Sequence, residues 1–265
     1  MIEYYVHNAS SFAADIDNLF FVITLIIGFW FFLVFGIFVY FLLRYRRKDG
    51  VKAEYITGEK HSETKWTHYP HYAVIAMDVV IIAVNILVWV DVKQTLPPRD
   101  NLVRVIGQQW SWSFIHAGPD GELDTQDDVL TVNDLHVKAG ETYHYELQSR
   151  DVLHNFAVPA FRLRQDAVPG RTISGWFKPS KTGIYDLQCA EMCGYGHGIM
   201  GAAVIVHSEE SFNTTMTQIQ NGTYESHYQK RMGTKTDLPS YTLSLIHISE
   251  PTRRYAISYA VFCLK

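Results

Sequence analysis

Residues 18–43 read NLFFVITLIIGFWFFLVFGIFVYFLL, a run of 26 residues without a single Asp, Glu, Lys, Arg or His. A helix of about 20 apolar residues is long enough to cross a hydrocarbon core of roughly 30 Å. A cleaved signal peptide would begin with a basic segment and have a shorter apolar core. Here Glu3, Asp15 and Asp17 precede the run and RYRRK follows it. We interpret the run as a retained membrane-spanning helix.

A second apolar run, YAVIAMDVVIIAVNILVWV, covers residues 72–90 and predicts a second spanning helix. Its Asp78 and Asn85 follow His71 at intervals of seven, so the three share one helix face that we expect to pack against protein. The positive-inside rule places the intervening basic loop in the cytoplasm or its equivalent, and both termini on the outer face. The loop's basic residues are Arg44, Arg46, Arg47, Lys48, Lys52, Lys60 and Lys65.

The region after Pro97 and Pro98 is polar enough to be soluble on the outer face. Short runs rich in β-branched and aromatic residues alternate with turn signals, which predicts an antiparallel β-sandwich or barrel. The first of these runs is LVRVIGQQWSWSF, and residues 209–221 are the one stretch here that could form a helix. We therefore predict a membrane-anchored α+β protein: a two-helix transmembrane hairpin followed by the β-domain.

The outer region is acidic. Residues 97–243 contain 17 Asp and Glu against 12 Lys and Arg, a charge of about −5. Such a surface favours a basic partner, although solubility alone would also explain it. The segment GPDGELDTQDD at residues 118–128 has the alternating acids of a calcium loop but lacks the bidentate acid at the twelfth position. We expect a solvated acidic hairpin there.

The stretch CAEMCGYGHGIM, residues 189–200, places two thiols, an imidazole and a thioether close together. Soft donors of this kind select copper over calcium, magnesium or manganese. We expect the second imidazole to come from His154, which precedes an apolar strand; His136, His144 and His207 are alternatives. Two thiolates can bridge two copper ions. A disulfide and a zinc site remain open at this point.

The pattern C-x-E-x-C-G-x-x-H-x-x-M, together with HNFAVPAF (residues 154–161) and DAVPGR (residues 166–171), resembles subunit II of haem-copper cytochrome c oxidases. The resemblance extends from the first helix to about Ile205 and implies a cupredoxin-like fold with a dinuclear copper A site. It implies bridging Cys189 and Cys193, terminal His154 and His197, and axial Met200. Glu191 would supply a backbone carbonyl to copper and its carboxylate to magnesium shared with subunit I.

The same resemblance implies a function. The chain would accept electrons from cytochrome c and pass them to haem in subunit I, for oxygen reduction coupled to proton translocation. Trp110 matches the residue that receives the electron, whereas Ser111 and Gln108 depart from the usual pattern. Glu63 resembles the glutamate at the mouth of a proton path, and the acids of residues 120–128 could steer a basic cytochrome c. Subunit I, other oxidase subunits and the lipid bilayer are the expected partners; nucleic acid is not.

Three other functions share part of this pattern. Nitrous oxide reductase has a similar copper motif, but its usual soluble architecture conflicts with two membrane spans. Subunit II of a quinol oxidase keeps the fold without the copper, whereas all five side-chain ligands are present here. A membrane-tethered cupredoxin acting as a simple carrier would not need Glu63 or the polar helix face. We favour a bacterial plasma membrane over the inner mitochondrial membrane.

The expected organisation is a hairpin segment at residues 1–96, a copper domain at residues 97–207 and a C-terminal extension at residues 208–243. Residues 244–265, SLIHISEPTRRYAISYAVFCLK, break the preceding pattern. Ile257–Leu264 can be encoded by a string that resembles a sequencing-library adapter. We interpret residues 244–265 as translated adapter, which removes Cys263 from the cysteine count.

Overall fold

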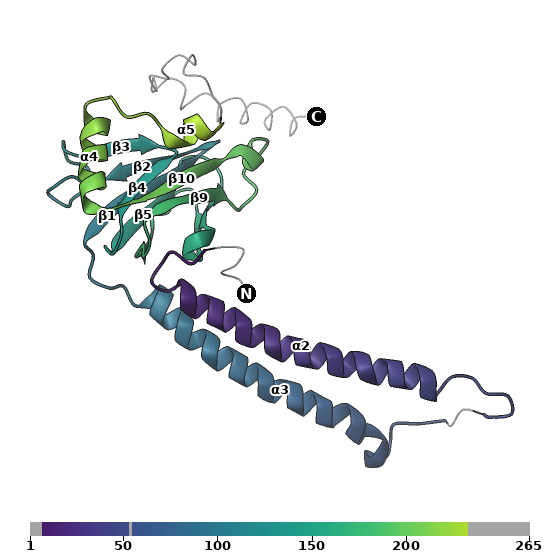
Figure 1. The fold of residues 1–265 in the computed structure, drawn as a ribbon. Coiled ribbons are helices and arrows are strands. Elements are labelled where there is room, and N and C mark those ends of the chain that lie inside the picture. Colours follow the sequence, from purple (N-terminus) through teal and green to yellow (C-terminus); the bar gives the residue numbers. More distant parts are fainter. Residues whose placement is uncertain (1–6, 53–54, 233–265) are drawn as a thin grey trace, which may run out of the picture. The chain divides into compact units, whose positions relative to one another are not determined.

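The computed structural model of the chain describes residues 7–52 and 55–232 (Figure 1). The predicted adapter tail and the last part of the extension, residues 233–243, lie outside these residues. Contacts divide the chain into two compact units: a helical unit, Phe12–Leu96, and a β-unit that contains everything else.

Two long helices form the helical unit, as predicted. They are α2 (Ala13–Arg44) and α3 (His61–Trp89), and the π-helix η1 (Val90–Gln94) continues α3. Both long helices are long and apolar enough to span a membrane. The predicted ranges were too short because they covered only the apolar runs. Helix α3 begins at His61, eleven residues before Tyr72, since polar residues outside a hydrocarbon core are also compatible with a helix.

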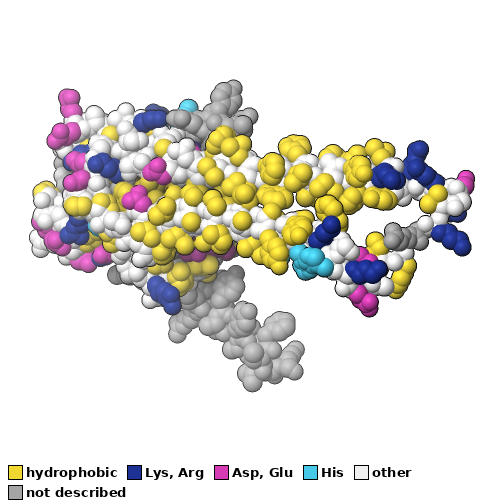
Figure 2. All heavy atoms as spheres, turned by 90° about the horizontal axis from the view of Figure 1, so that it is seen from below, with side chains coloured by type: hydrophobic (Ala, Val, Ile, Leu, Met, Phe, Trp, Pro, Cys, Tyr) yellow, Lys and Arg dark blue, Asp and Glu magenta, His cyan; other side chains and the backbone are white. Residues whose placement is uncertain are grey.

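The surfaces of these helices are mainly hydrophobic (Figure 2). Only Ala13 is buried in α2, and no residue is buried in α3. A helix that is apolar on all sides needs an apolar environment, which fits the predicted spans. Basic side chains gather in the loop that joins the helices, as Figure 2 shows. Asn85 donates its side-chain amide to the Ile81 carbonyl at 2.7 Å, so this polar group is hydrogen-bonded within its own helix.

The β-unit is a sandwich of two five-stranded sheets, which confirms the predicted fold class. One sheet has the order β3-β2-β1-β5-β8 and the other the order β4-β10-β9-β6-β7. The strands are β1 (Asn101–Gln108), β2 (Ser111–His116), β3 (Val129–Val132), β4 (Asp134–Lys138), β5 (Tyr143–Ser149), β6 (His154–Val158), β7 (Leu163–Ala167), β8 (Ile173–Phe177), β9 (Gly183–Cys189) and β10 (Gly201–His207).

The strand pairing is mixed. Strand β1 runs parallel to β5, and β10 runs parallel to β4, whereas the other paired strands are antiparallel. Parallel neighbours need a long crossover connection, and both of these pairs join strands that are separated by other strands in the sequence. The alternation of apolar residues along a single strand does not show its direction relative to a distant partner. The sequence therefore missed these two parallel pairs.

The run LVRVIGQQWSWSF is not one strand but a tight hairpin. Strand β1 ends at Gln108, β2 begins at Ser111, and these two residues pair across the turn. Trp110 lies in the turn with 38% of its surface exposed, whereas Trp112 is fully buried against Phe156, with ring centroids 5.8 Å apart. One tryptophan is therefore part of the core and the other is at the edge of the sandwich.

The β-unit also includes residues beyond the predicted 97–207 range. Near the N-terminus, the Ala9 amide donates to the Ala160 carbonyl at 2.9 Å, which joins residues 7–11 to the sandwich. Helix α4 (Glu209–Gln220) matches the stretch expected to be helical. It is followed by a short helix, α5 (His227–Met232), which the sequence did not predict and which lies beside the second sheet (Figure 1).

Three histidines that are not near the thiols are buried in the sandwich. His136 and His207 are hydrogen-bonded through Nδ1 and Nε2 at 2.9 Å, and His116 lies 6.4 Å from His136 between ring centroids. Burial lowers the pKa of His116 to about 4 and, together with its histidine neighbours, that of His136 to about 2. Both rings are therefore neutral in the folded protein at pH 7.

Acid should destabilise the β-unit through these rings. A pKa lowered in the folded state means that the unfolded chain binds more protons, so stability is lost as the pH falls from about 6.5 towards 4. The variant His116→Gln lacks this titration but keeps the carboxylates. We expect the free energy of unfolding of the wild type, relative to that of this variant, to fall by on the order of 1 kcal/mol from pH 7 to pH 5. Denaturant unfolding at both pH values measures it, and an unchanged difference contradicts the expectation.

Candidate metal centre

Sheet register brings His154 to Cys189. In the second sheet, Phe156 of β6 pairs with Cys189 of β9. Side chains two residues apart in a strand point to the same face, so His154 and Phe156 lie on one side of β6. Both His154 and Cys189 are buried, with 0% and 7% of their surfaces exposed. The 35 residues that separate them in sequence are thus bridged by neighbouring strands.

The remaining ligand candidates lie in the loop between β9 and β10, residues 190–200. Its base is closed where the Cys189 amide donates to the Met200 carbonyl at 3.0 Å. The loop includes the short 3₁₀ helix η3 (His197–Ile199), in which the Met200 amide donates to the His197 carbonyl at 3.2 Å. Because β9 and β10 are antiparallel neighbours, the loop returns on itself and directs Cys193, His197 and Met200 towards Cys189.

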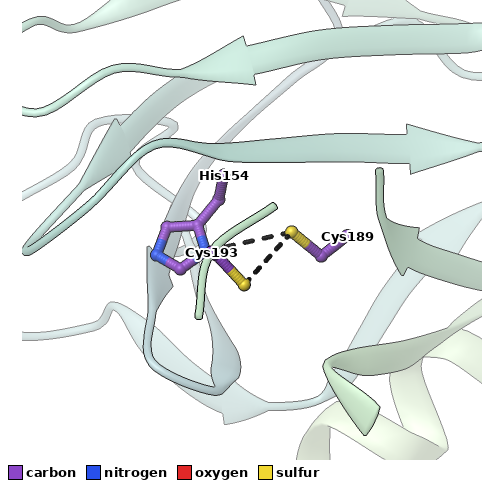
Figure 3. Close-up of side chains that lie close together, drawn as sticks. All are labelled: His154, Cys189 and Cys193. Carbon is purple, nitrogen blue, oxygen red and sulfur yellow. Dashed lines mark hydrogen bonds between the residues drawn. The ribbon is translucent and has the colours of Figure 1, made fainter. Parts of the chain in front are cut away.

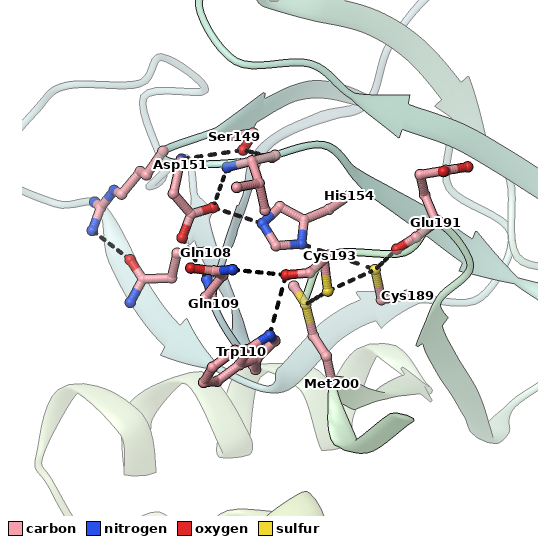
Figure 4. Close-up of polar contacts among 12 residues, drawn as sticks. Gln108, Gln109, Trp110, Ser149, Asp151, His154, Cys189, Glu191, Cys193 and Met200 are labelled. Atoms are coloured by element: carbon pink, nitrogen blue, oxygen red, sulfur yellow. Dashed lines mark hydrogen bonds and ion pairs between the residues drawn. The ribbon is translucent and has the colours of Figure 1, made fainter. Parts of the chain in front are cut away.

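The donor atoms converge on the two sulfurs (Figures 3 and 4). The Sγ atoms of Cys189 and Cys193 are 3.7 Å apart. Cys189 Sγ lies 3.9 Å from His154 Nδ1 and 3.2 Å from the Glu191 carbonyl oxygen. Cys193 Sγ lies 3.5 Å from His197 Nδ1 and 3.7 Å from Met200 Sδ. Each sulfur therefore has one imidazole and one weak donor beside it.

This spacing fits metal coordination and not a disulfide. A disulfide requires an S–S distance of about 2.05 Å, and both cysteines are free. One ion at about 2.3 Å from each of two sulfurs holds them less than about 4.6 Å apart, a limit that the 3.7 Å separation meets. The thioether of Met200 and the two thiols are soft donors, which favours copper over zinc. Two sulfurs with separate flanking donors suit two ions that share both sulfurs.

The alternative histidines are directed elsewhere. His136 is hydrogen-bonded to His207, and the His144 ring nitrogen lies 2.8 Å from the Pro97 carbonyl oxygen. Among the described residues, the group of His, Cys, Asp and Glu whose donor atoms lie close enough to hold a metal consists of His154, Cys189 and Cys193. His197 reaches the same pair of sulfurs from the loop.

Asp151 orients His154, and sequence reasoning missed it. Its Oδ1 lies 2.7 Å from His154 Nε2, and its Oδ2 accepts the Gln109 amide at 2.7 Å. A carboxylate on one ring nitrogen of a histidine ligand leaves the other nitrogen directed at the metal, and here Nδ1 faces Cys189. Burial opposes a charge on His154, but the bonds to Asp151 and Cys189 raise its pKa to about 9. The available signal was an acid three residues before the histidine.

The two thiols differ in their surroundings. Burial raises the pKa of both, but hydrogen bonds from His154 and from the backbone amides around Cys189 lower the pKa of that thiol below its ordinary value. Burial and the neighbouring Cys189 raise the pKa of Cys193. One thiol therefore ionises much more readily than the other. A metal ion that binds both displaces the second proton.

Trp110 lies against the ligand loop. Its Nε1 donates to the Cys193 carbonyl oxygen at 3.3 Å, and Gln109 Nε2 donates to the same oxygen at 2.7 Å (Figure 4). Gly196 makes this packing possible, because a Cβ there would lie 2.4 Å from Trp110 Cδ2. Gly194 has a φ of +113° beside Gln109, a conformation that favours glycine.

The carboxylates of the other predicted site residues make separate contacts. The Glu191 carboxylate points away from the two sulfurs, while its carbonyl faces Cys189 (Figure 4). Glu63 is in the first turn of α3, in the helical unit, where its carboxylate accepts the Gly58 amide at 2.9 Å. In the loop of residues 120–128 the acids Asp120, Glu122 and Asp124 are exposed, and Asp124 pairs with Arg104 at 2.6 Å.

A family model and curated relatives point to one family. Residues 123–208 match the family described as cytochrome c oxidase subunit II, periplasmic domain. The alternative cytochrome c oxidase subunit 2 of Bradyrhizobium diazoefficiens is 35% identical over 226 residues, which cover 77% of this chain and 79% of that protein. A cytochrome c oxidase subunit 2 from Thermostichus vulcanus is 40% identical over 130 residues, 49% of this chain and 36% of that one.

A solved structure is also similar. The periplasmic domain of subunit II of cytochrome oxidase from Bradyrhizobium japonicum is 31% identical, with a TM-score of 0.42. The similarity covers 49% of this chain and 100% of that domain.

Removing the Asp151 carboxylate should weaken metal binding. Without it, the His154 ring is no longer held with Nδ1 towards the sulfurs, and loss of such a partner typically costs about 10–100-fold in metal affinity. We expect a loss of that size for Asp151→Ala in a copper titration of the full chain in detergent against a chelator. Asp120→Ala, in the exposed acidic loop, serves as the control. Equal affinities for Asp151→Ala and wild type contradict the role given to Asp151.

Proposed function

Because the chain belongs to the cytochrome c oxidase subunit II family, we propose that it is the subunit that accepts electrons from cytochrome c at a dinuclear copper A site. From there the electrons pass to haem in subunit I of a haem-copper oxidase, where oxygen is reduced to water with proton translocation. The observation that carries the proposal is the convergence of two imidazoles, a thioether and a carbonyl on two free thiols 3.7 Å apart.

Five side chains and one carbonyl would hold the metal. Cys189 and Cys193 would hold it by their thiolates, His154 and His197 by their imidazoles, and Met200 and the Glu191 carbonyl would act as weak donors. Copper, when bound, would supply one-electron redox chemistry. The soft donor set selects this metal.

The protein supplies rigidity and exclusion of water. His154, Cys193 and Met200 are 0%, 3% and 2% exposed, so few water molecules need to reorient when the charge of the site changes. Asp151 holds one imidazole, and the amide-to-carbonyl bond between Cys189 and Met200 holds the base of the loop. Ligands that hardly move between two redox states keep the reorganisation cost of electron transfer low.

Trp110 is the proposed point at which the electron enters the subunit. Its ring is 38% exposed, and its Nε1 is hydrogen-bonded to the carbonyl of the bridging Cys193. It therefore connects the protein surface to a metal-binding residue through one hydrogen bond. The acidic loop of residues 120–128 would attract a basic cytochrome c.

Two further roles extend the proposal to the rest of the oxidase. The Glu191 carboxylate, which points away from the sulfurs, would bind magnesium shared with subunit I. Glu63, at the start of α3, would mark the mouth of a proton path on the side of the basic loop. The two spans would anchor the chain in a bacterial plasma membrane, with the β-unit on the periplasmic face and the other oxidase subunits beside it.

Electron paramagnetic resonance of the copper-loaded full chain tests the proposal. We expect a spectrum in which one unpaired electron is shared by two copper ions. Cys193→Ser should abolish the shared signal, because only one bridging sulfur remains. Cys263→Ser, which changes a cysteine outside the copper motif, should leave it intact. A spectrum from isolated single copper ions in the wild-type chain would overturn the dinuclear site.

The role of Trp110 can be tested by displacing its ring. In Gly196→Ala the new Cβ would lie 2.4 Å from Trp110 Cδ2, whereas nothing lies within 4 Å of a Cβ at Gly198. We expect Gly196→Ala to slow reduction by cytochrome c about tenfold, or about 1.4 kcal/mol in activation free energy, without changing the copper spectrum. Gly198→Ala is the matched control. Stopped-flow reduction measures both, and equal rates would rule out the role of Trp110.

A further inference from the structure

We propose that Tyr228, on helix α5 outside the ligand loop, positions Met200 by holding the peptide unit that precedes its side chain. The inference rests on the proposed copper site and deepens it. It assigns the C-terminal extension to the metal centre, although the copper motif ends at residue 200.

One peptide plane is held from both sides. The Tyr228 hydroxyl donates to the Ile199 carbonyl oxygen at 3.0 Å. That carbonyl shares a planar peptide unit with the Met200 amide, which donates to the His197 carbonyl at 3.2 Å. The orientation of this plane determines the direction in which the Met200 side chain leaves the backbone. The hydrogen bond to the His197 carbonyl is made within the loop, whereas the hydrogen bond from the Tyr228 hydroxyl comes from α5.

Packing does not hold this part of the loop. The Ile199 side chain is 67% exposed, and nothing lies within 4 Å of a Cβ at Gly198. Met200 itself is 2% exposed, with its Sδ 3.7 Å from Cys193 Sγ. A buried donor therefore follows a segment with few side-chain contacts. In such a segment a backbone hydrogen bond has a large influence on position.

Tyr228 is itself well fixed. It is 8% exposed and packs with Ala203 and Ile205 of β10. A Cβ at Gly201 would lie 3.1 Å from its hydroxyl and 3.4 Å from its ring, so glycine at the first position of β10 allows the close approach. Tyr228 therefore reaches the Ile199 carbonyl from a helix whose tyrosine side chain is packed against strand β10.

The sheet anchors α5. The carboxylate of Asp134, in β4 and 1% exposed, accepts the backbone amides of His227 at 2.8 Å and Tyr228 at 3.0 Å. It also accepts the Tyr224 hydroxyl at 3.1 Å. Arg231 forms an ion pair with Asp186 of β9. The position of Tyr228, and through it that of the peptide before Met200, is therefore tied to the strands of the second sheet.

Tyr228→Phe removes only the hydroxyl and tests the inference. A net hydrogen bond is worth about 1 kcal/mol, or roughly fivefold in an equilibrium constant. In the metal-free full chain in detergent, we expect hydrogen exchange at the Met200 amide to speed up about fivefold. In the copper-loaded chain we expect release of copper to a chelator to speed up by a similar factor. The copper absorption spectrum should also shift, because an axial donor tunes such a site.

Tyr224→Phe is the matched control, since it loses a hydroxyl bound to the same Asp134 but has no hydrogen bond to the ligand loop. It should leave exchange at Met200 and the spectrum unchanged. Equal effects from both variants would mean that the extension acts only through overall stability, and no effect from Tyr228→Phe would also overturn the inference. Exchange in the metal-free chain does not depend on copper, so this result stays separate from any failure of the proposed function.

Discussion

Strand β9 is hydrogen-bonded on both sides, and the ligand arrangement depends on these two pairings. Its pairing with β6 places His154 beside Cys189, and its pairing with β10 closes the loop that carries Cys193, His197 and Met200. A shift of one residue in either register would turn Cys189 to the opposite face of the sheet. The backbone hydrogen bonds of the second sheet thus bring candidate ligands that are far apart in the sequence to one site.

Three further contacts fix the residues around the two cysteines. Asp151 joins the β1–β2 turn to His154 by accepting both the Gln109 amide and the imidazole. Gly196 leaves room for Trp110 against the loop. Tyr228 reaches the Ile199 carbonyl from the C-terminal extension. Because these contacts come from two other turns and from helix α5, the loop geometry depends on the folded β-unit and not on the loop alone.

The two units of the chain obey different solvent constraints. Apolar side chains make up most of the surface of the long helices, as suits segments that satisfy their backbone internally in lipid. The β-unit buries its apolar residues between two sheets, and it also buries His116, His136, His207 and Asp134. The polar groups in this core explain how α4 and α5 are attached, since Asp134 fixes α5 and His207 contacts Ser211 of α4 at 2.9 Å.

Much of this organisation could be read from the sequence. The two spans, the strand-rich outer domain and the soft donors of residues 189–200 are local patterns, and local patterns report hydrophobicity and donor chemistry directly. The sequence did not show that the run LVRVIGQQWSWSF contains a turn, because the periodicity of its side chains continues through Gln109 and Trp110. The extent of α3 was underestimated because its polar first turns lack an apolar signal.

By itself, the sequence determined the kinds of donor, their order along the chain and the hydrophobic segments, since these are properties of residue type. The tertiary structure decided between His154 and the other candidate histidines, and only the tertiary structure decided that Asp151 orients this ring and that Tyr228 meets the loop from 29 residues away. The register of β6 against β9 sets the contact between His154 and Cys189, and the packing of Tyr228 on β10 sets its contact with the loop. Both depend on which distant segments bury their apolar faces together, and no single stretch of sequence contains that information.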